Sequence, residues 1–271
     1  MAFTNSSLVS YTRLSPNHSG QRTHAIDRIT PHCVVGQASV EGLGNTFAPV
    51  SRKASCQYGI GADGRIGMYC EEKNKSWCSS SNENDQRAVT IECASDATAP
   101  YAFRPVVYNK LIELCVDICK RNNKNILIWF GDKNTTLNYQ PKPNEMILTV
   151  HRWFAKKSCP GDWMYARMGD LANQVTTRLK NPNTSEQLTQ STQHTQPVDS
   201  NTFKPYKVKV EINNLNIRSG PGTNYYVVKI CPPNIYTIVA ESKGKGATMW
   251  GRLKSGIGWI SLDHVKKEGN A

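Results

Sequence analysis

The chain contains 271 residues, of which 38% are hydrophobic and 20% are charged. This balance is typical of folded globular proteins and excludes a disordered or fibrous chain, and the length favours two compact domains over one. With 33 lysines and arginines against 21 aspartates and glutamates, the formal net charge is +12, which favours polyanionic partners.

Three further classes of protein are not expected from the sequence. It contains no run of about 18 apolar residues, the minimum for a membrane-spanning helix, so membrane insertion is not expected. The beginning, MAFTNSSLVSYTRLSPNHSG, lacks the basic and apolar regions of a secretion signal. The basic residues are scattered rather than clustered on one helix, so nucleic acid is not the expected partner. The nine cysteines show no paired spacing, which predicts free thiols that lie mostly in the core.

Residues 1–180 alternate short strand-like segments with helical ones, which predicts an α/β domain. Strands are expected within 28–37, 87–95 and 126–133, and a hairpin within 56–72 that turns at Asp63-Gly64.

Two helices are expected later in this domain. Segment 104–121 has apolar residues three and four positions apart and Pro105 in its first turn, which predicts an amphipathic helix against one face of the sheet. Segment 162–180 is expected to form a closing helix that ends at Asn181-Pro182. Between them, 144–155 places His151 near the end of an element.

Residues 181–205 are rich in Thr, Ser, Gln, Asn and Pro and have almost no large apolar side chains, which predicts a linker. Residues 206–271 then show short strands with turn signals about every ten residues, which is typical of a small all-β barrel.

Three residues of the first domain are candidate metal ligands: His32, His151 and Cys159. Imidazole and thiolate are preferred zinc ligands, and a catalytic zinc site usually has three protein ligands and one open position. Each residue has a simpler interpretation, because a lone histidine is more often a surface or hydrogen-bonded residue and a lone cysteine is more often buried. The spacing does not show that such remote residues meet.

The ordered motifs ITPHCVV, SCQYGIGADGRIG, VTIECAS and H-x7-C-P-G resemble those of the type-2 N-acetylmuramoyl-L-alanine amidases, a family that includes phage lysins. The resemblance runs from about Arg22 to Leu179. It implies a mixed central β-sheet flanked by helices, with zinc bound by His32, His151 and Cys159 in a surface groove. It also leaves open whether Cys33 or Cys56 lies near the metal.

The resemblance also implies two catalytic residues. Glu92 would exchange a proton with the leaving amine, and Lys157 would stabilise the oxyanion. The simpler alternatives are a strand-end carboxylate in a salt bridge and a solvated lysine. The polar segment 71–87 is expected to be a loop at the groove, where Trp77 either stacks on substrate or packs on the protein.

Residues 206–267 resemble bacterial SH3 domains, through LNIRSGPGTNYYVV and GWISLDHV. The resemblance implies binding to wall peptides or glycans, with Tyr225, Tyr226 and Trp250 as candidate contacts and Trp259 as either a contact or a core residue. The local lysines and arginines would attract anionic wall polymers. Tethering would raise the effective concentration of the catalytic domain on an insoluble substrate.

Together these resemblances imply an enzyme that hydrolyses the amide between N-acetylmuramic acid and L-alanine in peptidoglycan. A wall hydrolase without a visible export signal is typical of a phage or prophage endolysin, which stays in the host cytoplasm until a holin opens the membrane and then acts on the cell wall. The alternative is a non-catalytic peptidoglycan-binding protein, although members of the wider fold that lose activity lack the zinc cysteine, which is present here as Cys159.

Overall fold

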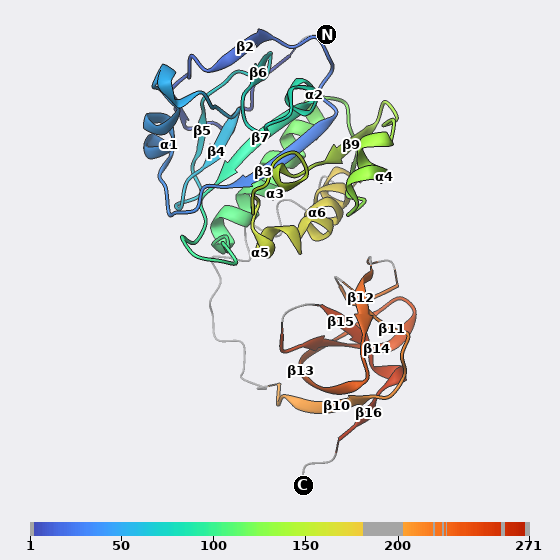
Figure 1. The fold of residues 1–271 in the computed structure, drawn as a ribbon. Helices are drawn as coiled ribbons and strands as arrows, with labels where there is room; N and C mark the ends of the chain where they lie inside the picture. Colours follow the sequence, from blue (N-terminus) through green and yellow to red (C-terminus); the bar gives the residue numbers. More distant parts are fainter. Residues whose placement is uncertain are drawn as a thin grey trace. The chain divides into compact units, whose positions relative to one another are not determined.

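The computed structural model describes residues 3–180 and 203–268, apart from 219, 224, 226, 256 and 257. The chain divides into two compact units, residues 1–186 and 187–271, which are described separately (Figure 1). Most of the expected linker, 181–205, lies outside the described residues, and its boundaries stay a prediction. Within the described part of the chain, no helix is long and apolar enough to cross a membrane.

The first unit is built on a seven-stranded mixed sheet. Its strands follow the order β1-β5-β4-β7-β3-β9-β8, and only the β4–β5 pair is antiparallel. The strands are β1 (Tyr11–Thr12), β3 (Arg28–Cys33), β4 (Tyr58–Ile60), β5 (Ile66–Met68), β7 (Ala88–Cys93), β8 (Ile126–Ile128) and β9 (Glu145–Leu148). A separate two-stranded sheet joins β2 (His18–Gln21) to β6 (Asn74–Ser76). The expected mixed α/β fold is confirmed.

Helices α3 (Pro105–Arg121) and α6 (Met168–Lys180) pack on each other and on one face of this sheet (Figure 1). Helix α3 matches the predicted amphipathic segment, with proline at its start. The predicted closing helix is two helices, because α5 (Asp162–Tyr165) ends before α6 begins. The other helices that the structure describes in this unit are α1 (Val40–Phe47), α2 (Asn82–Arg87), α4 (Lys133–Asn138) and the one-turn 3-10 helices η1 (Val50–Arg52) and η2 (His151–Trp153).

The alternation of side chains along β3 and β7 separates the core from the site. Ile29 and Cys33 of β3 join Val89, Ile91 and Cys93 of β7 in the core beneath α3 and α6. Successive strand residues point to opposite faces, so Arg28, Thr30 and His32 face the other way, together with Thr90 and Glu92. The polar face of the two central strands therefore carries the candidate chemistry.

Short polar elements cover this face. Thr30 and Thr149 share a hydrogen bond of 2.7 Å between their hydroxyls, and Asn84 of α2 bonds both of them at 3.0 Å. These buried groups are thus satisfied by one another, as a folded interior requires. The network fixes α2, and with it the segment 76–81 that precedes it, over the ends of β3 and β7.

The second unit is a seven-stranded antiparallel sheet with the order β12-β11-β15-β14-β13-β10-β16. Its elements are β10 (Tyr206–Val210), β11 (Leu215–Arg218), β12 (Val227–Cys231), β13 (Asn234–Gly244), β14 (Ala247–Leu253), β15 (Trp259–Ser261), η4 (Leu262–His264) and β16 (Lys266–Lys267). Its core contains Val208, Val210, Ile217, Ile238 and Ile260. The predicted all-β character is confirmed, whereas its SH3 identity stays a prediction.

Candidate metal centre and groove

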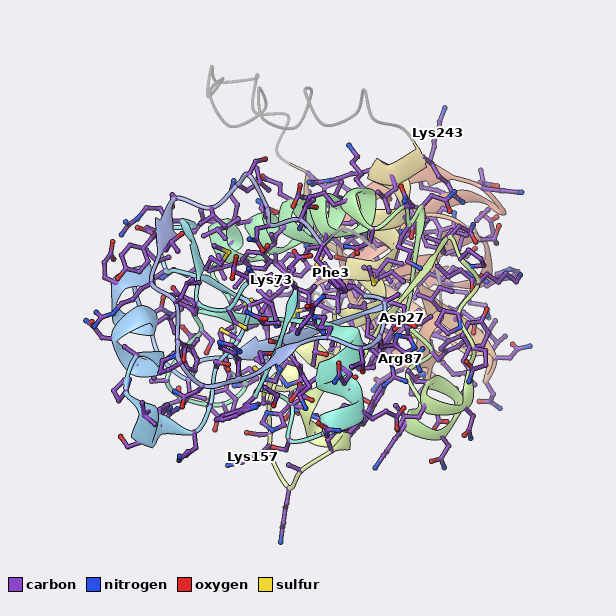
Figure 2. All side chains as sticks on the ribbon, turned by 90° about the horizontal axis from the view of Figure 1, so that it is seen from above. Phe3, Asp27, Lys73, Arg87, Lys157 and Lys243 are labelled. Carbon is purple, nitrogen blue, oxygen red and sulfur yellow. The ribbon has the colours of Figure 1, made fainter. Side chains whose placement is uncertain are left out.

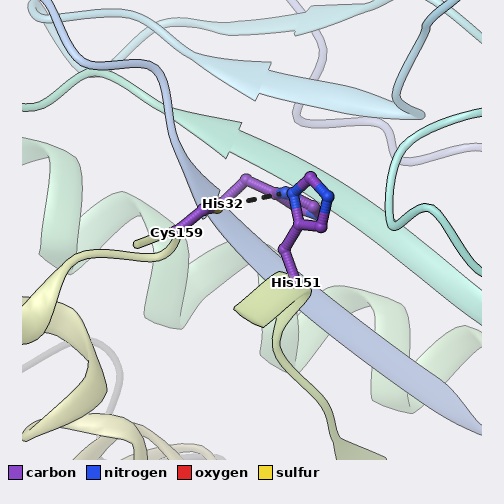
Figure 3. A group of neighbouring side chains, drawn as sticks. All are labelled: His32, His151 and Cys159. Carbon is purple, nitrogen blue, oxygen red and sulfur yellow. Dashed lines mark hydrogen bonds between the residues drawn. The ribbon is translucent and has the colours of Figure 1, made fainter. Parts of the chain in front are cut away.

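Three elements bring His32, His151 and Cys159 together. His32 lies near the end of β3, and His151 opens η2 just after β9, the parallel neighbour of β3 in the sheet. Cys159 lies in the loop between η2 and α5. The His32 and His151 rings have centroids 5.0 Å apart, and Cys159 Sγ lies 3.3 Å from His32 Nδ1 (Figure 3). All three donor atoms lie within 4.8 Å of one another.

The backbone conformation of the loop that carries Cys159 depends on Gly161. Gly161 has φ +85°, and a Cβ at this position would lie 2.9 Å from the Pro100 carbonyl oxygen and 2.9 Å from Tyr101 Cβ. Only glycine fits both the dihedral angle and this close approach. The Arg152 amide donates a 3.1 Å hydrogen bond to the Cys159 carbonyl, which ties the loop back to η2. Gly161 of the C-P-G sequence is therefore a structural requirement of the loop that carries Cys159.

The donor set fits a zinc ion. Burial, and then the nearby His151, lower the pKa of His32 well below its usual value. Burial followed by Lys157 lowers the pKa of His151. Both rings are therefore neutral at pH 7 and offer a lone pair, and with one thiol they make up the usual donor types and number of a catalytic zinc site. A hydrogen bond with Cys33, followed by burial, raises the pKa of Cys159, so a cation would be needed to hold it as thiolate.

Glu92 and Cys78 lie on the other side of His32. Glu92 is the register partner of His32 across β3 and β7. Cys78 Sγ lies 3.4 Å from His32 Nε2 and 3.9 Å from Glu92 Oε1. Burial, and then the Cys33 sulfur, raise the pKa of Glu92 to about 8. The two ring nitrogens of His32 thus face two different sulfurs, Cys159 and Cys78.

Segment 71–87, expected to be a loop, instead contains β6 and α2, and Cys78 lies between these two elements. Sequence reasoning misses Cys78, because Trp77 is the residue of this segment to which the sequence points. The two cysteines left open behave differently. Cys33 is hydrogen-bonded to Cys159, so it neighbours the candidate ligand. Cys56 is fully buried in a cluster with Leu43, Phe47 and Tyr69, against which Cys78 packs.

A groove of about 500 Å³ opens beside these residues, and Trp77, Cys78, Glu92, His151 and Lys157 line it. The Trp77 indole donates a 2.6 Å hydrogen bond to Ser19 Oγ, which holds the half-buried ring at the wall. Lys157 is exposed at the periphery of the unit (Figure 2). The structure therefore brings the three candidate ligands, both candidate catalytic residues and Trp77 to one site.

The candidate residues of the second unit have different surroundings. Tyr225 is half-buried and packs against Gly220. Trp250 is only 2% exposed, so its ring face is not available to a ligand, and the expectation of a direct wall contact needs correction at this residue. The physical reason is that β14 places Trp250 on the covered side of the sheet, beneath Gly244. Trp259 is half-buried, and Tyr226 lies outside the described residues.

A search of curated proteins found no match. Among solved structures, one described as "Structure of PlyL" aligns at 14% identity over 61% of this chain and 95% of that chain, with a TM-score of 0.44. A selenomethionine AmpD derivative aligns at 15% identity over 64% and 99%, with a TM-score of 0.44. A mutant endolysin from Bacillus subtilis aligns at 13% identity over 61% and 97%, with a TM-score of 0.43.

The family assignment rests on a separate comparison. The model of the N-acetylmuramoyl-L-alanine amidase family matches residues 21–162, just over half of the chain. This range contains β3, β7, β9 and the whole candidate metal centre. The chain belongs to the N-acetylmuramoyl-L-alanine amidase family.

Proposed function

We propose that this protein is a zinc-dependent amidase that hydrolyses the bond between N-acetylmuramic acid and L-alanine in bacterial peptidoglycan. The observation that carries the proposal is the convergence of His32, His151 and Cys159, with donor atoms within 4.8 Å, beside a groove of about 500 Å³ that His151 lines. A site with two neutral imidazoles and one thiol leaves a coordination position free for chemistry.

The three ligands would hold the ion, with His32 contributing Nδ1, the nitrogen that faces Cys159. Zinc, when bound, supplies a Lewis acid that polarises the scissile carbonyl and makes a neighbouring water molecule more acidic. Cys78 at 3.4 Å from His32 Nε2 orients the ring, as outer partners of metal-binding histidines do.

Glu92 would move the proton. Its carboxyl lies at the groove, and its pKa of about 8 lies close to neutrality. A group with a pKa near the working pH can both accept a proton from water and give one to the leaving amine. Lys157 also lines the groove, where its ammonium group would stabilise the negative charge that develops on the carbonyl oxygen. Trp77 would contact the sugar or peptide.

The biological setting follows from the same proposal. We assign residues 1–180 to the catalytic domain and 206–271 to an SH3-like domain that binds the wall, with 181–205 as the linker between them. The net charge of +12 would hold the protein on anionic wall polymers. An endolysin that is released from the host cytoplasm through a holin fits these features.

The test uses the purified full-length chain and peptidoglycan sacculi. We expect about one zinc per chain, lysis that stops on chelation and returns with zinc, and new alanine amino termini without new reducing sugars. Release of reducing ends instead would indicate a glycosidase. If the protein binds sacculi as tightly as the His151→Ala variant does and neither cleaves them, the non-catalytic alternative is correct.

A further inference from the structure

A second pocket, of about 280 Å³, adjoins the groove. Arg28, Ser80, Ser81, Glu83, Lys133 and Trp153 contribute to its wall. Ser80 and Ser81 line both cavities, and Ser80 Oγ lies 3.0 Å from His151 Nε2. Trp153 ends the 3-10 helix that His151 begins. The pocket therefore starts directly beside the candidate metal centre.

One of the residues that line this pocket is a buried cation. Arg28 is 1% exposed and lies on the same face of β3 as His32. Its Nη1 donates a 3.3 Å hydrogen bond to Asn84 Oδ1, whereas its Nη2 makes no hydrogen bond to any residue that the structure describes. The Glu83 carboxylate is 3.6 Å from Nη2, but the Glu83 side chain is 76% exposed. A buried guanidinium with an unused donor is costly unless a partner completes it.

The neighbouring carboxylate of Asp27 does not supply the partner that the Arg28 guanidinium lacks. Asp27 is committed to Arg87, with hydrogen bonds of 2.9 Å and 2.5 Å to its guanidinium, and Figure 2 shows the two residues side by side. Lys133, the first residue of α4, adds an exposed second cation to the pocket wall. Two cations and one largely exposed acid leave the pocket positively charged.

The remaining walls suit an organic anion. Trp153 lies parallel to Trp129, with ring centroids 5.0 Å apart, so its position is fixed by stacking. Ser80 and Ser81 supply hydroxyl groups at the junction with the groove. The planar guanidinium of an arginine can donate two parallel hydrogen bonds to a carboxylate, whereas a lysine acts as a point charge.

We infer that this pocket binds a carboxylate of the peptidoglycan stem peptide, with Arg28 Nη2 as the buried donor and Lys133 as the outer cation. The inference rests on the proposed function, because it takes the stem peptide as the ligand. A peptide that runs from the scissile bond past Ser80 enters the pocket, and its carboxylate meets Arg28. The pocket then selects substrates with a free carboxylate over those in which that group is an amide.

The test measures binding of a stem tetrapeptide that lacks the sugar and so has no scissile bond. Calorimetric titration of the full-length protein gives the affinity for two forms of the tetrapeptide. One form has free carboxylates, and in the other every carboxylate is an amide. We expect the amidated peptide to bind the wild type at least about ten-fold more weakly, since one hydrogen-bonded charge pair is lost. Lys133→Ala should reduce this ratio, Arg28→Gln should abolish it, and the surface control Lys120→Ala should leave it unchanged.

Two results overturn the inference: equal affinity of the wild type for both peptides, or a preference for the acid that survives in both Lys133→Ala and Arg28→Gln. If Arg28→Gln does not fold, the wild-type ratio and Lys133→Ala decide alone. Failure of the proposed function is a separate result, because it shows as absent alanine amino termini from sacculi, whereas the tetrapeptide titration requires no cleavage.

Discussion

Replacing Glu92 by glutamine is expected to stabilise the zinc-free protein at alkaline pH. The folded state raises the pKa of this carboxyl from 4.5 to about 8, chiefly through burial. A raised acid pKa means that the folded state keeps a proton that the unfolded state has already lost. Between these two pH values the free energy of unfolding therefore falls by about 1.4 kcal/mol per pH unit, because the unfolded chain binds one proton fewer.

Over the full interval between the two pKa values, the loss in the free energy of unfolding would amount to about 5 kcal/mol. Because part of Glu92 reaches the groove, we expect the measured loss to be about 2 to 5 kcal/mol. Glutamine keeps the shape of the side chain and cannot ionise, so the variant should match the wild type near pH 5 and exceed it at pH 8.5. Urea unfolding of both proteins in the presence of a chelator measures this difference. Glu113→Gln, which changes a surface carboxylate paired with Lys110, is the matched control.

Stability curves that stay parallel for the wild type and Glu92→Gln from pH 5 to pH 8.5 would refute the burial argument. The same variant also tests catalysis. With zinc restored, loss of the proton-transfer group should reduce the rate of amide cleavage by about 100-fold or more, while zinc content stays unchanged.

Three further perturbations test other parts of the first unit. Cys159→Ser should lose zinc during dialysis and with it all lysis, as measured by metal analysis, and retention of one zinc per chain would remove Cys159 from the ligand set. Gly161→Ala should cost about 1–3 kcal/mol in backbone strain, with more from the contact with Pro100, so an unchanged melting temperature would contradict the role given to this glycine. Arg87→Met should cost about 3–5 kcal/mol in urea unfolding, because it leaves Asp27 buried without its partner, and a neutral effect would show that water reaches the carboxylate.

Local sequence signals predicted several elements of the structure well. The spacing of apolar residues fixes α3, because a period of three and four positions is itself the geometry of an amphipathic helix. Turn residues and alternation likewise predicted the β4–β5 hairpin and the all-β second unit. Helices α1, α2 and α4 were not predicted, since each has only six to eight residues and depends on capping and packing more than on its own periodicity.

The sequence by itself determined which residue types were available for a metal centre, since two histidines and a cysteine in recognisable motifs pointed to zinc chemistry. Only the tertiary structure decided that they meet, because the parallel pairing of β3 with β9 joins residues more than a hundred positions apart. It alone placed Cys78 against His32, buried Trp250, and left one nitrogen of Arg28, a residue of the second pocket, without a hydrogen bond to any described residue. Such contacts depend on strand order and on what covers each face of the sheet, and no local pattern of residues encodes either of these.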